Sequence, residues 1–461
     1  MLLNFNLRSV FLLCIFLMLY QATLGYTLAI SSIVVLLYLF YLYKHERLSF
    51  VDGIFGLSFL MNVWFITRTV GNVYQYDYFN FYMHADYFVM NDFFVKNPKM
   101  YLSSVYFQPP LWGFIAGIIT KLMMLIGQTK EAGFDFVRFI SLFAISGSGI
   151  IFWKLIKKFD IKENIALIGF AFYCFFPIHS ILSGLVNNDA MIYFLMLMVI
   201  YLAYSWYLDN SWYNAILISI LLLVGGLIKF SALMVASGLV VLILCKLVAD
   251  KKNYKIILGQ SFLMGVGCLL GFAWGIFLLY FDFPLVPPPQ SNAFQDLSAV
   301  ALSDRLFSLD TILLPFVNLR SGLLENNVWL SLIKTSLFGE WMWDNGLFAY
   351  VLYVIGFVFA FIAVISFFSL LKVKLGKDYS FNLFVIVLVF AVIISWIGFW
   401  MEYPYFCSTE YRYVVILLPL SLLWIMNWWQ NLSLPKWSNY TLIGLVALLI
   451  IAKFMLYLNT I

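Results

Sequence analysis

Long apolar runs separated by short polar stretches make up most of this chain. A membrane-spanning helix needs about 20 apolar residues, and lysine and arginine favour its cytoplasmic flank. The run from Val10 to Tyr43 is too long for one helix, so it predicts a hairpin of two helices that turns near Gly25. The basic residues at 44–47 then face the cytoplasm, and a third helix, Phe50 to Arg68, carries the chain outward.

The next segment, residues 69–108, is polar and aromatic and is predicted to be the first outer loop. An apolar helix follows from Pro109 to about Ile126, and whether it crosses decides the side of every later loop. If it spans, three basic loops face outward; if it is re-entrant or interfacial, all three face the cytoplasm. We favour the second interpretation because three independent loops agree with it. Their basic residues are Lys154, Lys157, Lys158, Lys162, Lys246, Lys251, Lys252, Lys255, Lys372, Lys374 and Lys377.

This arrangement predicts an all-α polytopic membrane protein of about thirteen spans, with the N-terminus cytoplasmic and the C-terminus outside. Four polar segments then share the outer face: residues 71–108, 184–189, 281–346 and 402–413. Within the long outer loop, residues 282–346, amphipathic pieces such as Ser303–Val317 are expected in the membrane interface or over a cavity. We find no internal repeat, so residues 1–461 are predicted to form a single membrane domain.

Composition supports the same class, with 64% hydrophobic and 11% charged residues and a mean hydropathy of +0.96. A soluble fold could not bury this much apolar surface. The net charge of +5 resides largely in short loops, which indicates orientation and gives no reason to expect a nucleic-acid partner. Four of the five cysteines lie in apolar runs without a C-x-x-C pair, so neither a disulfide framework nor a zinc site is expected. The first residues show no small-residue cleavage site typical of a removable signal peptide.

Two ionisable residues, Asp189 and Lys229, lie at the predicted outer ends of apolar helices. Charges at membrane depth are costly and therefore indicate function, although a structural ion pair between two helices explains them equally well. In the functional interpretation, Lys229 attracts an anionic lipid head group.

The first outer loop contains Asp77, His84 and Asp86. A carboxylate beside a cavity can act as general base toward a hydroxyl, and a second carboxylate or a histidine can hold a metal or orient the first. The alternative is that these side chains are simply solvated.

The last outer turn, residues 404–413, places Arg412 where a guanidinium can fork onto phosphate oxygens. The alternative is a flanking residue paired with Glu410. Arg68 and Arg320 are weaker candidates for the same role, and Arg138 is predicted to anchor a helix end.

Together these motifs resemble the GT-C fold glycosyltransferases that use polyprenyl-phosphate sugars, in the protein mannosyltransferase-like and aminoarabinose-transferase-like branch. The similar strings are Gln75-Tyr76-Asp77-Tyr78, Met83-His84, Pro109-Pro110-Leu111, Val186-Asn187-Asn188-Asp189-Ala190, Gly226–Ser231, Phe338-Gly339-Glu340-Trp341 and Pro404–Tyr413. They occur in the family's order. Tyr76, Met83 and Gln108 differ from the His, Gly and Lys or His of relatives, so a divalent metal is left open as cofactor.

The resemblance implies an inverting transferase of a bacterial cell membrane, active on the extracytoplasmic side. It implies that Asp77 is the base, with Asp86 or His84 as second base, metal ligand or orienting group. The residues expected to bind substrate or phosphate are Lys229, Arg412, Gln108, Asp189, Tyr413 and Glu340. The implied partners are a polyprenyl-phosphate sugar donor, membrane lipid and a glycan, lipid-linked or protein acceptor.

Two other classes stay open. A lipid-linked sugar flippase or transporter predicts repeats and broken helices lined with charge near the membrane midplane. A polysaccharide polymerase or ligase also has many spans and large outer loops.

Overall fold

The computed structural model describes most of the chain. The described residues are 27–45, 49–69, 75, 77–93, 109–281, 296–316, 325–340, 346–376, 378–432, 434–435 and 437–458. Among them, β-structure is limited to an isolated antiparallel bridge between Asp296 and Tyr405. The expected turn near Gly25, together with Gln108 and Arg320, lies outside the described residues.

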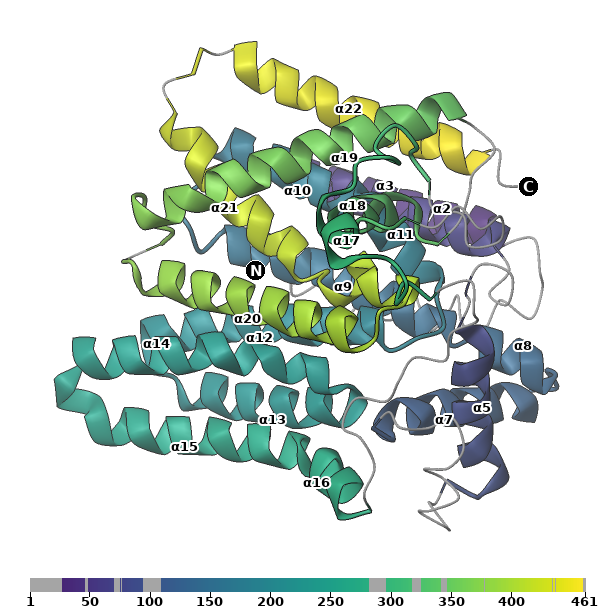
Figure 1. Cartoon of the computed structure of the whole chain (residues 1–461), viewed down its shortest axis with the longest axis horizontal. Coiled ribbons are helices and arrows are strands. Elements are labelled where there is room, and N and C mark those ends of the chain that lie inside the picture. Colours follow the sequence, from purple (N-terminus) through teal and green to yellow (C-terminus); the bar gives the residue numbers. More distant parts are fainter. Residues whose placement is uncertain are drawn as a thin grey trace.

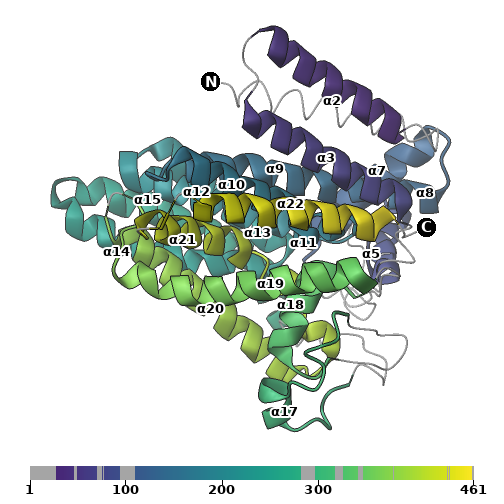
Figure 2. The ribbon, with the colours of Figure 1, turned by 90° about the horizontal axis from the view of Figure 1, so that it is seen from above.

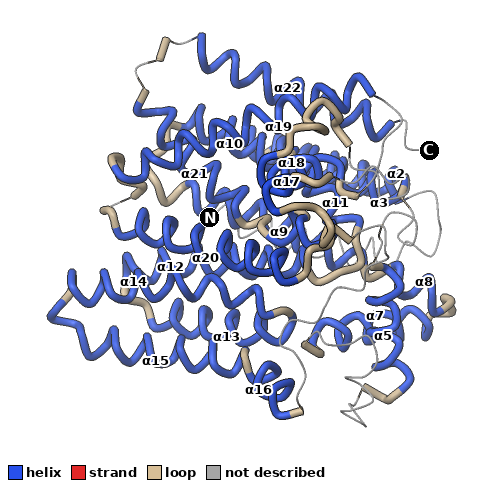
Figure 3. The backbone as a smooth tube through the Cα atoms, in the orientation of Figure 1, coloured by secondary structure: helices blue, strands red, loops and turns tan. Residues whose placement is uncertain are grey.

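Helices form nearly all of the described chain (Figure 3). The first half contains α2 Thr27–Lys44, α3 Phe50–Arg68, α5 Tyr78–Met90, α7 Leu111–Leu125, α8 Lys130–Asp135, α9 Arg138–Ile156, α10 Glu163–Phe175, α11 Pro177–Gly184, α12 Asp189–Asp209, α13 Trp212–Ile228 and the 3₁₀ turn η1 Phe230–Met234. The second half contains α14 Val235–Ala249, η2 Lys251–Asn253, α15 Tyr254–Gly271, α16 Ala273–Tyr280, α17 Leu302–Phe307, α18 Val328–Phe338, α19 Gly346–Phe367, η4 Phe368–Leu371, α20 Ser380–Glu402, η5 Phe406–Thr409, η6 Tyr411–Tyr413, α21 Leu417–Asn431 and α22 Trp437–Leu458.

Nine helical stretches of the described part are long and apolar enough to cross a membrane. They are Phe50–Arg68, Lys130–Ile156, Glu163–Gly184, Asp189–Asp209, Phe230–Ala249, Lys251–Gly271, Gly346–Leu371, Ser380–Glu402 and Trp437–Leu458. The chain is therefore an all-helical, multi-pass membrane protein, as its hydropathy predicts. Helices α2, α13 and α21 pack beside these spans. The total of about thirteen stays a prediction because residues 1–26 lie outside the described part.

The long helices run side by side, so the bundle has two ends (Figure 1). At one end, which we call the basic end, the described parts of four loops lie together: 157–162, 207–211, 246–255 and 370–382. The rings of Phe159 and Phe381 are in contact, with centroids 5.1 Å apart. Asn210 donates to Asp250 at 2.9 Å, and Tyr207 donates to Asp378 at 2.7 Å. Asn427 at the end of α21 donates to the carbonyl of Lys374 at 3.1 Å. The three lysine-rich loops thus share one end, as the charge pattern predicts.

At the opposite end, Arg138 fastens three helix ends together. Its Nε donates to the carbonyl of Gly184, the last residue of α11, at 2.7 Å, and its Nη1 donates to the carbonyl of Thr69, just after α3, at 2.8 Å. The side chain is 3% exposed. The prediction that Arg138 anchors a helix end is confirmed.

The same contact settles the path of α7. Since Thr69 at the end of α3 contacts Arg138 at the start of α9, α3 ends and α9 begins at the same end of the bundle. Helix α7 is 15 residues long, about 22 Å at 1.5 Å per residue, and packs on α5 and α8. It does not carry the chain from one end to the other, which agrees with the re-entrant or interfacial interpretation.

Small residues allow the closest helix pair, α13 and α15, to approach backbone to backbone. A Cβ at Gly267 would lie 2.3 Å from the carbonyl oxygen of Ser219, and one at Gly226 would lie 2.5 Å from that of Gly271. Membrane helices associate through such contacts because lipid provides no hydrophobic drive between them. This packing fixes the end of α13, where Lys229 follows.

Candidate functional site

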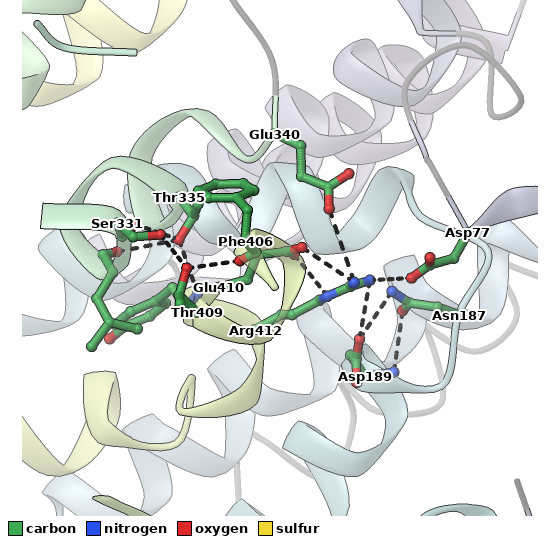
Figure 4. Close-up of polar contacts among 12 residues, drawn as sticks. Asp77, Asn187, Asp189, Ser331, Thr335, Glu340, Phe406, Thr409, Glu410 and Arg412 are labelled. Carbon is green, nitrogen blue, oxygen red and sulfur yellow. Dashed lines mark hydrogen bonds and ion pairs between the residues drawn. The ribbon is translucent and has the colours of Figure 1, made fainter. Parts of the chain in front are cut away.

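The site is organised around Arg412, in the η6 turn that precedes α21. Its Nη1 lies 2.9 Å from Oδ2 of Asp77, and its Nε lies 2.8 Å from Oε2 of Glu410. Two further carboxylates are close, with Asp189 Oδ2 at 3.9 Å from Nη1 and Glu340 Oε1 at 4.0 Å from Nη2. The Arg412 side chain is 9% exposed, whereas that of Asp77 is 31% exposed. Four segments that are distant in sequence therefore converge on one guanidinium (Figure 4).

A second cation, Lys229, shares Asp189 with Arg412. Lys229 Nζ lies 2.5 Å from Oδ1 of Asp189 and 5.1 Å from the centroid of the Tyr413 ring. Lys229 follows α13 in an extended conformation, φ −163° and ψ 132°, which breaks the helix before η1. Its side chain is 22% exposed, more than that of Arg412. Lys229 is thus the more accessible of the two cations.

Local structure explains how the carboxylates are presented. Asp77 precedes α5 without capping it, so its carboxylate is free to meet Arg412. Asp189 begins α12, where the helix dipole favours a negative charge, and Asn187 donates to its Oδ2 at 3.1 Å. Glu340 follows Gly339, whose φ of +63° and ψ of −141° suit glycine.

Gln75 ties the Asp77 segment to the turn before Asp189. Its Oε1 accepts from the backbone N–H of Val186 at 2.6 Å, and its Nε2 donates to the carbonyl of Val186 at 3.0 Å. Both hydrogen bonds are buried. We did not assign Gln75 a role from the sequence, and its place two residues before Asp77 was the available signal.

Buried hydroxyl groups hold the turn that carries Arg412. Ser331 and Thr409 are hydrogen-bonded at 2.7 Å, and Thr335 accepts from the backbone N–H of Tyr411 at 2.9 Å. Ser331 and Thr335 lie on α18 (Figure 4). Helix α18 therefore fixes both Glu340, which follows it, and the backbone next to Arg412.

Acidic groups outnumber basic ones here, with Asp77, Asp189, Glu340 and Glu410 facing Lys229 and Arg412. Burial raises the pKa of the Glu410 carboxyl well above its ordinary value, against the opposing charge of Arg412 and with help from Glu340. Burial works to lower the pKa of Arg412, but the neighbouring carboxylates, Glu410 foremost, raise it well above its ordinary value. The guanidinium stays charged, and the Glu410 carboxyl holds a proton more readily than an ordinary glutamate does.

Two cavities flank Arg412. One is lined by Gln75, Glu340 and Glu410 together with apolar residues of α11. The other has Asp189, Lys229 and Tyr413 at its polar side and apolar side chains along the rest of its wall. Those apolar residues are Ile192, Met196, Met234, Val392, Val415 and Ile416. The second cavity thus offers a cation beside an apolar surface.

Asp86 and His84 have other surroundings. Asp86 lies 2.9 Å from Nζ of Lys130, in α8. His84 is 3% exposed and packs under α7, where a Cβ at Gly113 would lie only 2.4 Å from its ring. Burial lowers the pKa of His84 to about 3, so the ring is neutral.

The structure brings together six of the predicted site residues: Asp77, Lys229, Arg412, Asp189, Tyr413 and Glu340. Gln108 lies outside the described residues.

The carboxylates do not form a divalent-metal centre in this arrangement. Asp77, Asp189, Glu340 and Glu410 face the guanidinium of Arg412 or the ammonium of Lys229, and Asp86 faces Lys130. No group of three or more potential ligands is found among the described residues. We therefore assign no chemical step to a metal.

Compared with known proteins, the chain matches no protein-family model and no curated relative.

Proposed function

We propose that the protein is an inverting glycosyltransferase that moves a sugar from a polyprenyl phosphate to an acceptor hydroxyl. The observation that carries this proposal is the contact between Asp77 and Arg412 beside the Lys229 cavity. A carboxylate, a buried guanidinium and an accessible ammonium meet at the end of the bundle opposite the basic end. By the positive-inside rule, the basic end faces the cytoplasm, so the site lies on the extracytoplasmic side of a bacterial cell membrane.

Asp77 is proposed as the general base. Among the four carboxylates around Arg412 its side chain is the most exposed, at 31%, so an acceptor hydroxyl can approach it. A general base must lie within hydrogen-bond reach of the hydroxyl whose proton it takes. In this proposal Arg412 orients Asp77, because its guanidinium already contacts several carboxylates. Glu410 and Glu340 hold the guanidinium in turn.

Lys229 is proposed to bind the donor phosphate. It has one carboxylate partner, Asp189, and a more exposed side chain than Arg412. The apolar wall of its cavity suits the first isoprenoid units of a lipid whose tail lies in the bilayer. A fixed cation next to the leaving phosphate stabilises the charge that develops as the bond breaks.

The reaction is a single displacement. The acceptor oxygen forms a bond to the anomeric carbon as its proton passes to Asp77. The bond between that carbon and the phosphate oxygen breaks, and its electron pair leaves with the polyprenyl phosphate. The configuration at the anomeric carbon inverts. The acceptor is proposed to be an envelope glycan, a lipid-linked glycan or a protein.

Purified protein in nanodiscs tests this proposal, with sugar-labelled polyprenyl phosphate and an extract of envelope acceptors. We expect label to move to the acceptor fraction, and Asp77→Asn to reduce the rate by at least roughly 100-fold. The matched control is Asp86→Asn. It removes a carboxylate of α5, the helix that Asp77 precedes, and this carboxylate is paired with Lys130 of α8. A rate for Asp77→Asn within a few fold of the unchanged protein would refute the role of Asp77.

A lipid-linked sugar flippase is the second candidate, and one feature of the described helices favours it. Helix α10 ends at Phe175 and α11 begins at Pro177, so this span is broken. Buried His179 lies just past the break, and buried Lys453 lies in α22, which packs against α10. Charge beside a broken helix is typical of transporters. The protein reconstituted in lipid vesicles tests this function. Movement of intact donor from one leaflet to the other, without cleavage of its sugar bond, would support the flippase.

A further inference from the structure

The segment from Leu302 to Leu314 exposes large apolar side chains. Phe307 is 74% exposed, Leu309 is 58% exposed and Leu313 is 77% exposed. Leu302 and Leu314 are also exposed. Several bulky apolar groups on so short a stretch are unusual on a surface that faces water.

This segment has a fixed position on the bundle. The Nδ2 of Asn327, at the start of α18, donates to the carbonyl oxygens of Leu306 at 3.1 Å and Ser308 at 2.9 Å. The guanidinium of Arg305 lies over the Trp400 ring, 5.8 Å from its centroid. Trp400 lies two residues before the end of α20, so the segment is held at the level of the last turn of a membrane-spanning helix.

The segment projects sideways from the bundle instead of beyond its end. In Figure 1 α17 lies over the bundle, short of the ends of the long helices, and in Figure 2 it stands out to one side at the same level. Its neighbour α20 presents Ile394 and Met401 outward, 65% and 55% exposed. Since Arg305 lies over Trp400 near the end of α20, the exposed apolar side chains of the segment are held next to a helix that also exposes apolar residues.

Aromatic residues mark the same level. Trp329, Trp396 and Trp400 are in ring contact in sequence, with centroids 5.6 Å apart for the first two and 6.3 Å apart for the last two. Tryptophan is enriched where membrane meets water. Of the three rings, Trp329 is 41% exposed, whereas Trp396 and Trp400 are buried, so Trp329 is the ring that can meet head groups beside the segment.

We propose that residues 302–314 are embedded in the leaflet on the site's side of the bilayer and bind phospholipid acyl chains. Phe307, Leu309 and Leu313 contact the chains, and Arg305 stays at the head-group level over Trp400. Loops outside a membrane are mostly solvated, whereas in this proposal residues 302–314 of the long outer loop enter one leaflet without crossing the bilayer. The proposal is independent of the transfer reaction.

Photo-crosslinking in native membranes tests it. A benzophenone amino acid replaces Leu313 in one variant and Phe307 in another, and Ser298, an exposed polar residue of the same loop, in the control. After irradiation, intact-mass spectrometry is expected to show phospholipid adducts at the two test positions in at least roughly tenfold excess over the control.

Other outcomes overturn the proposal. Adducts to a second copy of this chain would assign the surface to a self-contact, and adducts to another protein would assign it to a partner. Phospholipid adducts no more abundant than at Ser298 would place the segment in water. Two test positions are used so that a folding defect in one variant does not decide the result.

Discussion

Asp77 and Arg412, which lie in the first and last of the predicted outer segments, form an ion pair of 2.9 Å. The carboxylate has a partly exposed side chain and the guanidinium is buried. Because the guanidinium also contacts Glu410 at 2.8 Å, it is held in place from the side opposite Asp77. The pair thus joins a partly exposed carboxylate to a buried positive charge that is held in place.

Arg412→Lys should reduce sugar transfer by roughly 10- to 100-fold, since an ammonium cannot reproduce the planar fork that contacts several carboxylates at once. The steady-state rate at saturating donor measures the effect. Arg68→Lys, at an exposed position, is the control and should leave the rate unchanged. Equal rates for both variants would show that guanidinium geometry at position 412 is unimportant.

Lys229→Met should destabilise the protein by about 1–3 kcal/mol, because Asp189 would lose a charged partner while remaining buried. The double variant Lys229→Met with Asp189→Asn also removes the negative charge that Lys229 had balanced and should recover most of the stability. Thermal unfolding in detergent measures both. Donor binding should stay weak in the double variant; recovery of binding together with stability would mean that Lys229 serves only as a structural partner.

Gly113→Ala should destabilise the protein by about 1–3 kcal/mol, because the added methyl group would overlap the His84 ring at 2.4 Å. Combining it with His84→Ala should restore stability, and a melting-temperature series detects the coupling. The control is Gly444→Ala in α22, where nothing lies within 4 Å of the added atom. Additive losses in the double variant would argue against the contact.

Stability should also fall as pH decreases, in part through His84. Burial lowers the pKa of His84 to about 3 in the folded protein, whereas its ordinary pKa is about 6.5. Between these two pH values the imidazole is protonated in the unfolded chain and neutral in the folded protein. The stabilisation from His84 is complete above pH 6.5 and declines below it, by roughly 1.4 kcal/mol per pH unit, until about pH 3.

Unfolding followed from pH 7 to pH 4.5 measures this slope. His84→Phe should flatten it, while His45→Phe, at an exposed position, should not. A slope that is unchanged by His84→Phe would mean that other groups account for the acid sensitivity.

The membrane helices and the shared end of the lysine-rich loops were predictable because hydropathy and charge report them directly. Asp189, Lys229 and Arg412 were predictable as site residues for a related reason: a charge next to an apolar helix needs an explanation. Which charged residues contact one another was harder to predict from the sequence. Gln75 acts through its amide on a backbone turn, which leaves no sequence pattern, and Asp86 contacts Lys130 because of how α8 folds back, which hydropathy does not specify.

The fastening of α3, α9 and α11 by Arg138 has an evolutionary consequence. Thr69 and Arg138, the two limits of the segment that contains α5, α7 and α8, lie together at one end of the bundle, so the length of this segment can change without reversing the direction of any later helix. Insertions and deletions in this segment would therefore change the surroundings of Asp77 while the later helices keep their direction.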